Sequence, residues 1–367
     1  MLSNKNFTAA FPGKYIQGEN AIKGLPELIQ LFSNKGLIIA SPSVKSKVLP
    51  FCRFDDSVVT LSTEIFAGEC CEKELNRLQE KVADCGAGIL IGMGGGKTID
   101  VAKIVADRAG IPVIIVPTIA STDAPCSGCA VIYSEEGVFE SVYYTKMNPQ
   151  VVLVDTTLIA NAPVRFLVAG MGDALATWFE ARSCVQSRSL NGCGGLSTLT
   201  GSNLARLCYD TILRYGTEAM HSCEKKVVSP ALEYITEANI LLSGIGFESS
   251  GLAAAHSVHN GLSALSETHS YYHGEKVAFG VLTGLHLTSS PAEERETVYS
   301  FCEAVGLPTT FSEIGIHEVN SEKLMLVALK ACAPHEGIHH EIVEVTPAKV
   351  VDAMIAADAQ GQSRKNQ

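Results

Sequence analysis

Residues 87–98 read Ala-Gly-Ile-Leu-Ile-Gly-Met-Gly-Gly-Gly-Lys-Thr, which is an apolar strand, a glycine turn and the start of a helix in succession. Glycine lets the backbone reach positive φ and come close to a ligand. The helix that follows offers unpaired N–H groups and the positive end of its dipole to an anion. We therefore predict a phosphate-binding turn at residues 94–98.

Two familiar phosphate motifs do not fit this turn. The nucleoside-triphosphate loop requires glycine where Ile91 stands, and a dinucleotide fingerprint that starts at Gly92 requires glycine where Lys97 stands. A turn that only packs the helix against the strand is the alternative. Three adjacent glycines cost folding entropy, which favours a ligand that needs close approach.

Short apolar runs alternate with helical patterns in the first part of the chain. We expect strands at residues 36–40, 58–61, 88–92, 111–116 and 151–155. Between them, residues 69–85 and 98–109 have the apolar spacing of amphipathic helices. This alternation predicts a sheet covered by helices.

The pattern changes at about residue 162. Segments of helical period follow at residues 173–187, 196–223, 231–247 and 252–265, and residues 187–200 are expected to form a loop. The sequence thus predicts an α/β dinucleotide-binding domain at residues 1–162 and an all-α domain at residues 163–367. A length of 367 residues agrees with two domains.

The composition excludes several classes of protein. Hydrophobic residues make up 46% of the chain and charged residues 18%, which is typical of a globular protein with a large core. The net charge of −11 argues against nucleic acid and anionic membranes as partners. Residues 1–14 do not resemble an export leader, and the 12 cysteines are scattered, so we expect a cytoplasmic protein with reduced thiols.

Cys126 and Cys129 have the spacing of a redox or zinc-binding pair. No second pair completes a four-cysteine site, and the segment does not open a helix after a thioredoxin-type strand. We interpret the spacing as a coincidence within a loop.

Residues 117–123 read Pro-Thr-Ile-Ala-Ser-Thr-Asp and follow one of the expected strands. They place hydroxyl groups and one carboxylate at the carboxyl end of that strand, which is the edge where open α/β sheets bind ligands. Asp123 is therefore a candidate to hold a hydroxylated substrate. A turn or cap aspartate is the alternative.

Asp173, His256 and His273 are candidate metal ligands in the helical part. One carboxylate and two imidazoles bind a divalent ion and leave a coordination position for water or substrate. For each residue alone, a satisfied histidine or a helix N-cap is the simpler interpretation. His259 and His269 compete with His256 and His273 as ligands.

Several runs resemble the iron-containing alcohol dehydrogenase family, and within it the members that oxidise glycerol. The resemblance spans nearly the whole chain and is densest at residues 94–100, 117–125, 172–181, 246–249 and 273–280. It implies a dehydroquinate synthase-like architecture, with a cleft between a dinucleotide-binding domain and a helical domain that carries the metal ion.

The resemblance also implies roles for individual residues. Asp173, His256 and His273 become the metal ligands, and Asp123 contacts the polyol, so these four form the catalytic and substrate-binding set. The matched cofactor contacts are Gly96, Lys97, Thr118, Ser121, Ser127, Cys129 and Tyr133. The glycine turn adds Gly94, Gly95 and Thr98, and the end of the first expected strand adds Ser41.

Three departures from the family pattern modify these expectations. Iron-using relatives carry a further histidine where Thr177 stands, so three protein ligands indicate zinc. Ser41 replaces the usual acidic residue, which keeps NAD favoured but admits NADP, with Lys45 near enough in sequence to help bind a 2′-phosphate. Residues 337–344 are altered as well, which leaves the role of His339 open.

The expected reaction interconverts glycerol, or a similar small vicinal diol, and dihydroxyacetone. Zinc would lower the pKa of the reacting hydroxyl while hydride passes to NAD, and Asp123 would orient a second hydroxyl. We also expect a homo-oligomer. The alternatives are a dehydroquinate synthase-like lyase, for which Lys276 is the only nearby base to hold a phosphate, and a non-catalytic nucleotide-binding protein.

Overall fold

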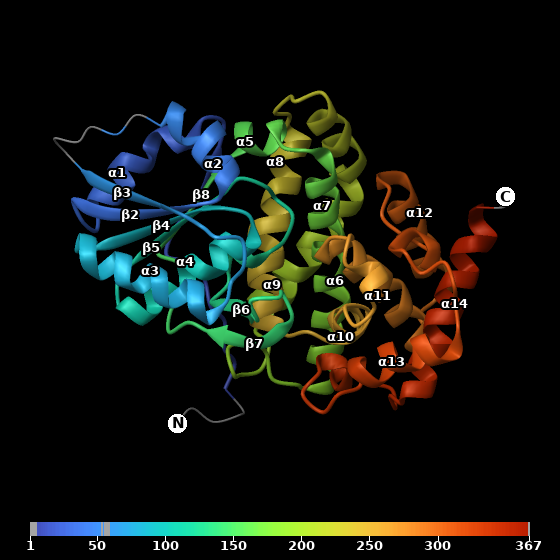
Figure 1. The fold of residues 1–367 in the computed structure, drawn as a ribbon. Helices are drawn as coiled ribbons and strands as arrows, with labels where there is room; N and C mark the ends of the chain where they lie inside the picture. The colour runs from blue at the N-terminus through green and yellow to red at the C-terminus, as the bar shows by residue number, and fades with distance from the viewer. Residues whose placement is uncertain (1–5, 53, 55–58, 366–367) are drawn as a thin grey trace.

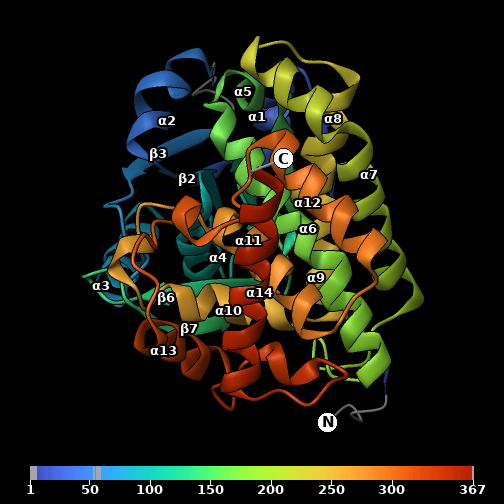
Figure 2. The same cartoon turned by 90° about the vertical axis from the view of Figure 1, so that its right-hand side faces the viewer.

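The computed structural model describes residues 6–52, 54 and 59–365. Figure 1 shows a sheet with its helices on the left and a second, helical part on the right, with the C-terminal helix at the far edge. The same elements seen from the side form a continuous body (Figure 2). The division at residues 162 and 163 into two domains stays a prediction, since one large apolar cluster runs from the sheet into the helices.

Six parallel strands form the main sheet in the order β1-β8-β5-β4-β2-β3. The strands are β1 (Tyr15–Gly18), β2 (Lys35–Ala40), β3 (Thr60–Ile65), β4 (Ile89–Gly94), β5 (Val113–Pro117) and β8 (Val151–Asp155). Ala40 pairs with Met93, and Gly94 pairs with Pro117, so β2, β4 and β5 end at one edge of the sheet. The chain runs from β2 outward to β3 and returns to β4 on the other side, which makes the β2–β4 boundary the switch point of the sheet.

Helices cover both faces of this sheet because its central strands are apolar on both sides. Ile38 and Ile91 face α1 (Leu25–Gln30) and α2 (Pro42–Lys47). Leu37 and Leu90, one position away on each strand, face α3 (Glu72–Cys85) and α4 (Gly96–Ala109). The short 3-10 turns of this part are η1 (Ala21–Gly24), η2 (Leu49–Phe51) and η3 (Ala124–Cys126).

The predicted parallel strands are present, and two features were not predicted. The expected strand at residues 58–61 corresponds to β3, and its residue 58 lies outside the described residues. β1 was missed, as was the antiparallel hairpin of β6 (Cys129–Tyr133) and β7 (Phe139–Tyr144). The side chains of β7 are mostly exposed, so this strand lacks the apolar run by which the other strands were recognised.

The rest of the chain is helical. Its elements are α5 (Thr156–Asn161), α6 (Val164–Ser187), α7 (Leu199–Glu224), α8 (Pro230–Glu237), the π-helical turn η4 (Ala238–Leu242), α9 (Ser243–Ser250), α10 (Ala254–Leu262), η5 (Ser266–Thr268), α11 (His273–Leu287), α12 (Ala292–Val305), η6 (Phe311–Ile314), α13 (Ser321–Ala331), η7 (Gly337–His340) and α14 (Pro347–Lys365). The expected loop at 187–200 is present between α6 and α7. No helix of the described residues is both long and apolar enough to cross a membrane.

Helices α6 and α11 cross at unusually close range. A Cβ atom on Gly172 would collide with the carbonyl oxygen of Gly274, and one on Gly274 would collide with that of Ala169. Glycine is therefore required at this crossing, and the crossing brings Asp173 of α6 next to His273 of α11. The suggestion that Asp173 only caps a helix is wrong, because α6 begins at Val164 and Asp173 lies in its interior.

Candidate active site

Asp173, His256 and His273 meet at one point although they come from α6, α10 and α11. Oδ1 of Asp173 lies 3.3 Å from Nε2 of His256 and 3.1 Å from Nε2 of His273. One ligand atom from each residue lies within 4.8 Å of the others. Among the described residues this is the one cluster of histidine, cysteine and carboxylate groups with the spacing of a metal site. The predicted competitors lie outside it.

The carboxylate of Asp173 is fully buried. Burial alone would raise its pKa, but the charges and hydrogen bonds of His273 and His256 outweigh burial and hold the pKa of Asp173 well below its usual range. The group is therefore an anion in the interior of the protein. No Lys or Arg of the described residues forms an ion pair with it.

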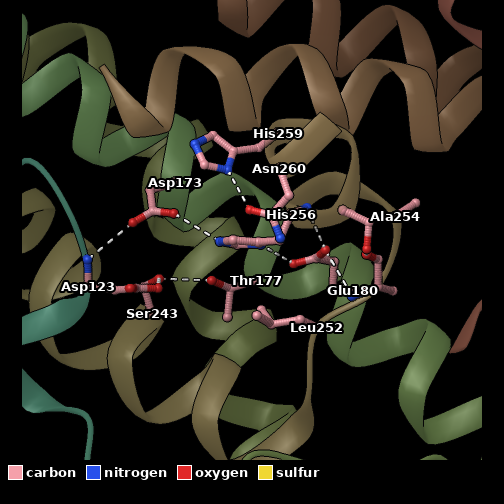
Figure 3. A network of polar contacts seen from close by, with 12 residues as sticks. Asp123, Asp173, Thr177, Glu180, Ser243, Leu252, Ala254, His256, His259 and Asn260 are labelled. Carbon is pink, nitrogen blue, oxygen red and sulfur yellow. Dashed lines mark hydrogen bonds and ion pairs between the residues drawn. The ribbon is translucent and has the colours of Figure 1, made fainter. Parts of the chain in front are cut away.

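Glu180 orients His256 and was not identified from the sequence. Its Oε2 lies 2.6 Å from Nδ1 of His256, while its Oε1 accepts the backbone N–H groups of Ala253 and His256 at 2.9 and 3.0 Å (Figure 3). Burial would lower the pKa of His256, but Glu180 and Asp173 together hold it well above its usual value. Because Glu180 accepts the hydrogen bond from Nδ1–H of His256, Nε2 is the ring nitrogen that faces Asp173.

His259 and His269 have other partners. Nε2 of His259 lies 3.0 Å from Nδ1 of His273, so His259 contacts the ring nitrogen of this candidate ligand that faces away from Asp173. Burial, followed by the charge of His273, lowers the pKa of His259 well below its usual value. The ring of His269 contacts the carbonyl oxygen of Ser263 at 3.1 Å.

Asp123 lies beside this cluster, in the loop that follows β5. Its backbone N–H donates to Oδ2 of Asp173 at 3.2 Å, and its carboxylate accepts a hydrogen bond from Ser243 at 2.7 Å. Burial, and then the charge of Asp173, raise the pKa of Asp123 well above its usual value. Asp123 precedes η3 but its side chain makes no capping bond, so the alternative of a cap aspartate is wrong.

The predicted glycine turn joins the end of β4 to the start of α4. Gly94 ends the strand, Gly95 is the N-cap, and α4 begins at Gly96, two residues before the expected start. A Cβ on Gly94 would lie 2.8 Å from Oγ1 of Thr98, so the turn has no room for a side chain there. Thr118 follows β5 and donates its N–H to the carbonyl oxygen of Gly94 at 3.0 Å.

Ser41 lies across the switch point from the glycine turn. Its N–H donates to the carbonyl oxygen of Met93 at 3.1 Å, and its Oγ caps α2 by accepting the N–H of Val44 at 3.4 Å. Lys45 is exposed on the same short helix. The structure therefore places the neutral hydroxyl of Ser41 directly after β2, across the switch point from the glycine turn.

The remaining cofactor candidates lie on the loop and strand after β5. Ser121 and Ser127 are buried, while Cys129 and Tyr133 on β6 are partly exposed. Nζ of Lys97 lies 2.6 Å from Glu69 and 4.9 Å from the centre of the Tyr133 ring.

Cys126 and Cys129 are both free thiols. Burial raises the pKa of Cys129 to about 12, which opposes a thiolate role for this residue.

Lys103 of α4 is a second residue that sequence reasoning missed. Its side chain is fully buried, and its ammonium group donates to the carbonyl oxygens of Ala124 at 2.9 Å and of Cys129. It thereby fixes the segment that carries the candidate contacts after β5.

His339 is not part of the site, because its ring contacts the carbonyl oxygens of Cys332 and Ala333 at the end of α13.

Comparison with known proteins defines the class. Residues 12–156 match the family model for iron-containing alcohol dehydrogenases. The solved structure of glycerol dehydrogenase from Schizosaccharomyces pombe has a TM-score of 0.95 and 36% identity, with 99% of this chain and 93% of that chain covered. Together with the relatives below, these matches show that the chain belongs to the iron-containing alcohol dehydrogenase family, and they confirm the predicted fold class.

The relatives are similar over their full length. A glycerol dehydrogenase of Thermotoga maritima is 53% identical, with 98% of this chain and 99% of the relative covered. A glycerol dehydrogenase of Escherichia coli O6:H1 is 48% identical, with 96% of each chain covered.

Proposed function

We propose that this protein is a metal-dependent dehydrogenase that interconverts glycerol, or a similar small vicinal diol, and dihydroxyacetone with NAD as the hydride acceptor. The observation that carries the proposal is the meeting of Asp173, His256 and His273 beside Asp123. The full-length similarity to glycerol dehydrogenases supports the choice of substrate.

The residues at this point suit a divalent cation. A buried carboxylate is costly unless a positive charge accompanies it, and Asp173 has two imidazoles but no Lys or Arg of the described residues as an ion-pair partner. Asp173, His256 and His273 would hold the ion, and zinc suits one oxygen and two nitrogen donors with an open position. Once bound, the ion supplies a Lewis acid that lowers the pKa of a substrate hydroxyl.

The protein itself supplies orientation. Glu180 holds the ring of His256, and the carboxylate of Asp123 would accept a hydrogen bond from a second hydroxyl of the polyol. The N–H groups at the start of α4, beside Gly95 and Gly96, would bind the pyrophosphate of the cofactor. These three roles would hold the substrate carbon and the cofactor in a fixed relative position. Such positioning can account for a large part of an enzyme's rate enhancement.

NAD is the proposed cofactor, with NADP as the alternative that Ser41 admits. Changing Ser41 to Asp places a carboxylate at the switch point, where it repels a 2′-phosphate and accepts from a ribose hydroxyl. We expect the ratio of kcat/KM for NAD to that for NADP to rise at least tenfold in the Ser41→Asp variant. A ratio that stays constant would show that Ser41 does not face the ribose.

The lyase alternative is not favoured. The relatives are dehydrogenases, and two cationic side chains on the helices that carry His273 and Asp173 already have polar partners. Nζ of Lys276 contacts Oγ of Ser263 at 3.3 Å, and Arg165 pairs with Glu275 at 2.6 Å. A phosphorylated substrate would need several free cations here.

We also propose that the protein forms a homo-oligomer and that it is cytoplasmic. Apolar side chains of α13, including Leu326 and Leu329, are exposed, which is consistent with contact to another copy.

The direct test of the proposed function follows cofactor reduction by absorbance with glycerol, 1,2-propanediol and other short diols, using NAD and NADP in parallel. We expect NAD reduction with at least one vicinal diol. Replacement of His256 by Ala should abolish turnover and bound metal together. Absence of turnover with every diol, in protein that contains no metal, would support a non-catalytic nucleotide-binding protein instead.

A further inference from the structure

A chain of three buried side chains connects the helical part to the loop after β5. Oγ1 of Thr177, on α6, lies 2.8 Å from Oγ of Ser243, the first residue of α9. Oγ of Ser243 donates to Oδ2 of Asp123 at 2.7 Å. Figure 3 shows the three side chains one after another, beside Asp173 and His256. Thr177 and Ser243 are fully buried, so water does not compete with these bonds.

The hydrogen bonds of this chain run in one direction. Oγ of Ser243 donates its single hydroxyl proton to Oδ2 of Asp123, so it has no proton left to donate to Thr177. The lone pairs of Ser243 then face Thr177, which must be the donor.

The π-helical turn η4 sets the direction of Ser243. The N–H of Ser243 bonds to the carbonyl oxygen of Ala238, five residues earlier, where an α-helix would use the residue four earlier. Helices α8 and α9 and the turn η4 between them form one continuous helical rod. From this rod, Asn239 donates to the carbonyl oxygen of Ala120 at 3.0 Å, and Glu248 accepts the N–H of Gly128 at 2.8 Å. The rod from α8 to α9 thus holds the loop after β5 at three places.

The two carboxylate oxygens of Asp123 differ in their surroundings. Oδ2 has Ser243 as its donor, while no donor among the described residues bonds Oδ1. Oδ1 is therefore the oxygen that is free to accept a hydrogen bond from a ligand, and Ser243 decides how that oxygen is aimed.

We propose that Ser243 and Thr177 are positioning residues for the substrate: their hydroxyl chain aims Oδ1 of Asp123 at the second hydroxyl of the polyol. This inference rests on the proposed function, because it takes the polyol as the ligand of Asp123. It assigns to the turn of α6 after Asp173 a role in orienting substrate.

Packing alone does not account for the hydroxyl of Thr177. The methyl group of Thr177 packs against α9, since a Cβ on Gly246 would lie 2.7 Å from Cγ2 of Thr177. The hydroxyl points to Ser243. Thr177→Val therefore keeps the packing methyl and removes only the donor, whereas Thr177→Ser keeps the donor and removes the methyl.

The experiment compares Ser243→Ala, Thr177→Val and Thr177→Ser with wild type in kcat/KM for glycerol and in bound zinc per chain. Thr283→Val is the matched control, because Thr283 is a fully buried helical threonine whose hydroxyl, among the described residues, bonds only within its own helix, to Phe279 at 3.0 Å. We expect kcat/KM to fall about tenfold to a hundredfold in Ser243→Ala, the range for loss of a hydrogen bond to a charged group.

In Thr177→Val we expect a smaller decrease in kcat/KM, and in Thr177→Ser a kcat/KM close to that of wild type. Bound zinc per chain should be unchanged in all variants. In an Asp123→Ala background, Ser243→Ala should have little further effect, since the residue it acts through is gone.

Three results would overturn the inference. They are unchanged kcat/KM in both Ser243→Ala and Thr177→Val, loss of zinc from Ser243→Ala, and an equally large effect of Ser243→Ala with and without Asp123. If wild type itself fails to oxidise any diol, the proposed function has failed, and that result is distinct from all three.

Discussion

At the scale of single residues, the site depends on the groups that contact the Nδ1 atom of each candidate histidine ligand. His256 has Glu180 at Nδ1, and His273 has His259 at Nδ1, so both rings present Nε2 to Asp173. Such supporting groups fix the tautomer and the orientation of a ligand before the ion arrives. The support of His256 is charged and buried, whereas that of His273 is a neutral ring, because the pKa of His259 is lowered.

Changing Glu180 to Gln should therefore weaken metal binding while the fold is retained. The amide keeps the shape of the side chain but removes the negative charge, and we expect zinc affinity to fall about tenfold to a hundredfold. A competition titration with a chelator of known affinity measures this. Glu341→Gln is the control, since Glu341 is a nearby, partly buried carboxylate that bonds Ser183 and Ala254 but neither ligand ring. Equal zinc affinity in the two variants would contradict the role of Glu180.

Individual residues also show why sequence reasoning found part of the site. Asp173, His256 and His273 were found through their residue types and their match to a family pattern. Glu180 lies seven residues after Asp173, two turns along one face of α6, and that spacing was the available signal for it. Lys103 offered no signal, because a lysine in an amphipathic helix is normally expected on the exposed side.

At the scale of elements, the close crossing of α6 and α11 controls the distance between Asp173 and His273. Gly274→Ala should disturb this crossing, because the added methyl group meets the backbone of Ala169. We expect a loss of about 1–3 kcal/mol in the free energy of unfolding by urea, together with weaker zinc binding. Gly284→Ala, on the same helix, is the control, since its new Cβ would lie 3.4 Å from that of Ala254, an ordinary contact. Equal stability of the two variants would contradict this account of the crossing.

The contact between α9 and the segments that flank the β6–β7 hairpin should depend on pH. Glu248 accepts hydrogen bonds from Gly128 and from Asn148 at 2.8 and 2.6 Å, and burial raises its pKa above the usual value. A carboxyl group whose pKa is raised by folding stabilises the folded state while it is protonated. That contribution is present below the pKa of the unfolded chain, about 4.3, and is lost as pH rises through the raised pKa.

The free energy of unfolding of wild type should therefore fall relative to Glu248→Gln as pH rises above about 4.3. Chemical unfolding of both proteins across this range tests the sign. A difference that does not change with pH, or that changes in the opposite direction, would contradict the assignment to Glu248.

Elements were predictable where burial leaves a clear pattern. The central strands are apolar on both faces, so β2, β4, β5 and β8 appear in the sequence as short apolar runs. The exposed strand β7 has no such run. Asp173 was associated with a helix start because Gly170 and Gly172 suggested a flexible segment, whereas both glycines lie inside α6 and serve close packing.

At the scale of the whole molecule, the candidate active site lies where the edge of the sheet meets the helices. The glycine turn and the loop with Asp123 come from the sheet, and Asp173, His256 and His273 come from the helices. The backbone N–H of Asp123 bonds the carboxylate of Asp173 directly, so the two parts share one network. Residue types suggested the three metal ligands as a set, but local sequence patterns cannot show long-range contacts, so only the family resemblance placed Asp123 and the glycine turn at the same cleft.

On the proposed function, diol oxidation needs an ion held by Asp173, His256 and His273. This requirement is tested most directly by measuring zinc content and glycerol-dependent NAD reduction in the same samples, before chelation, after chelation and after zinc is returned. We predict about one zinc per chain, parallel loss of both quantities on chelation, and parallel recovery. Full turnover in protein shown to be free of metal would contradict the account.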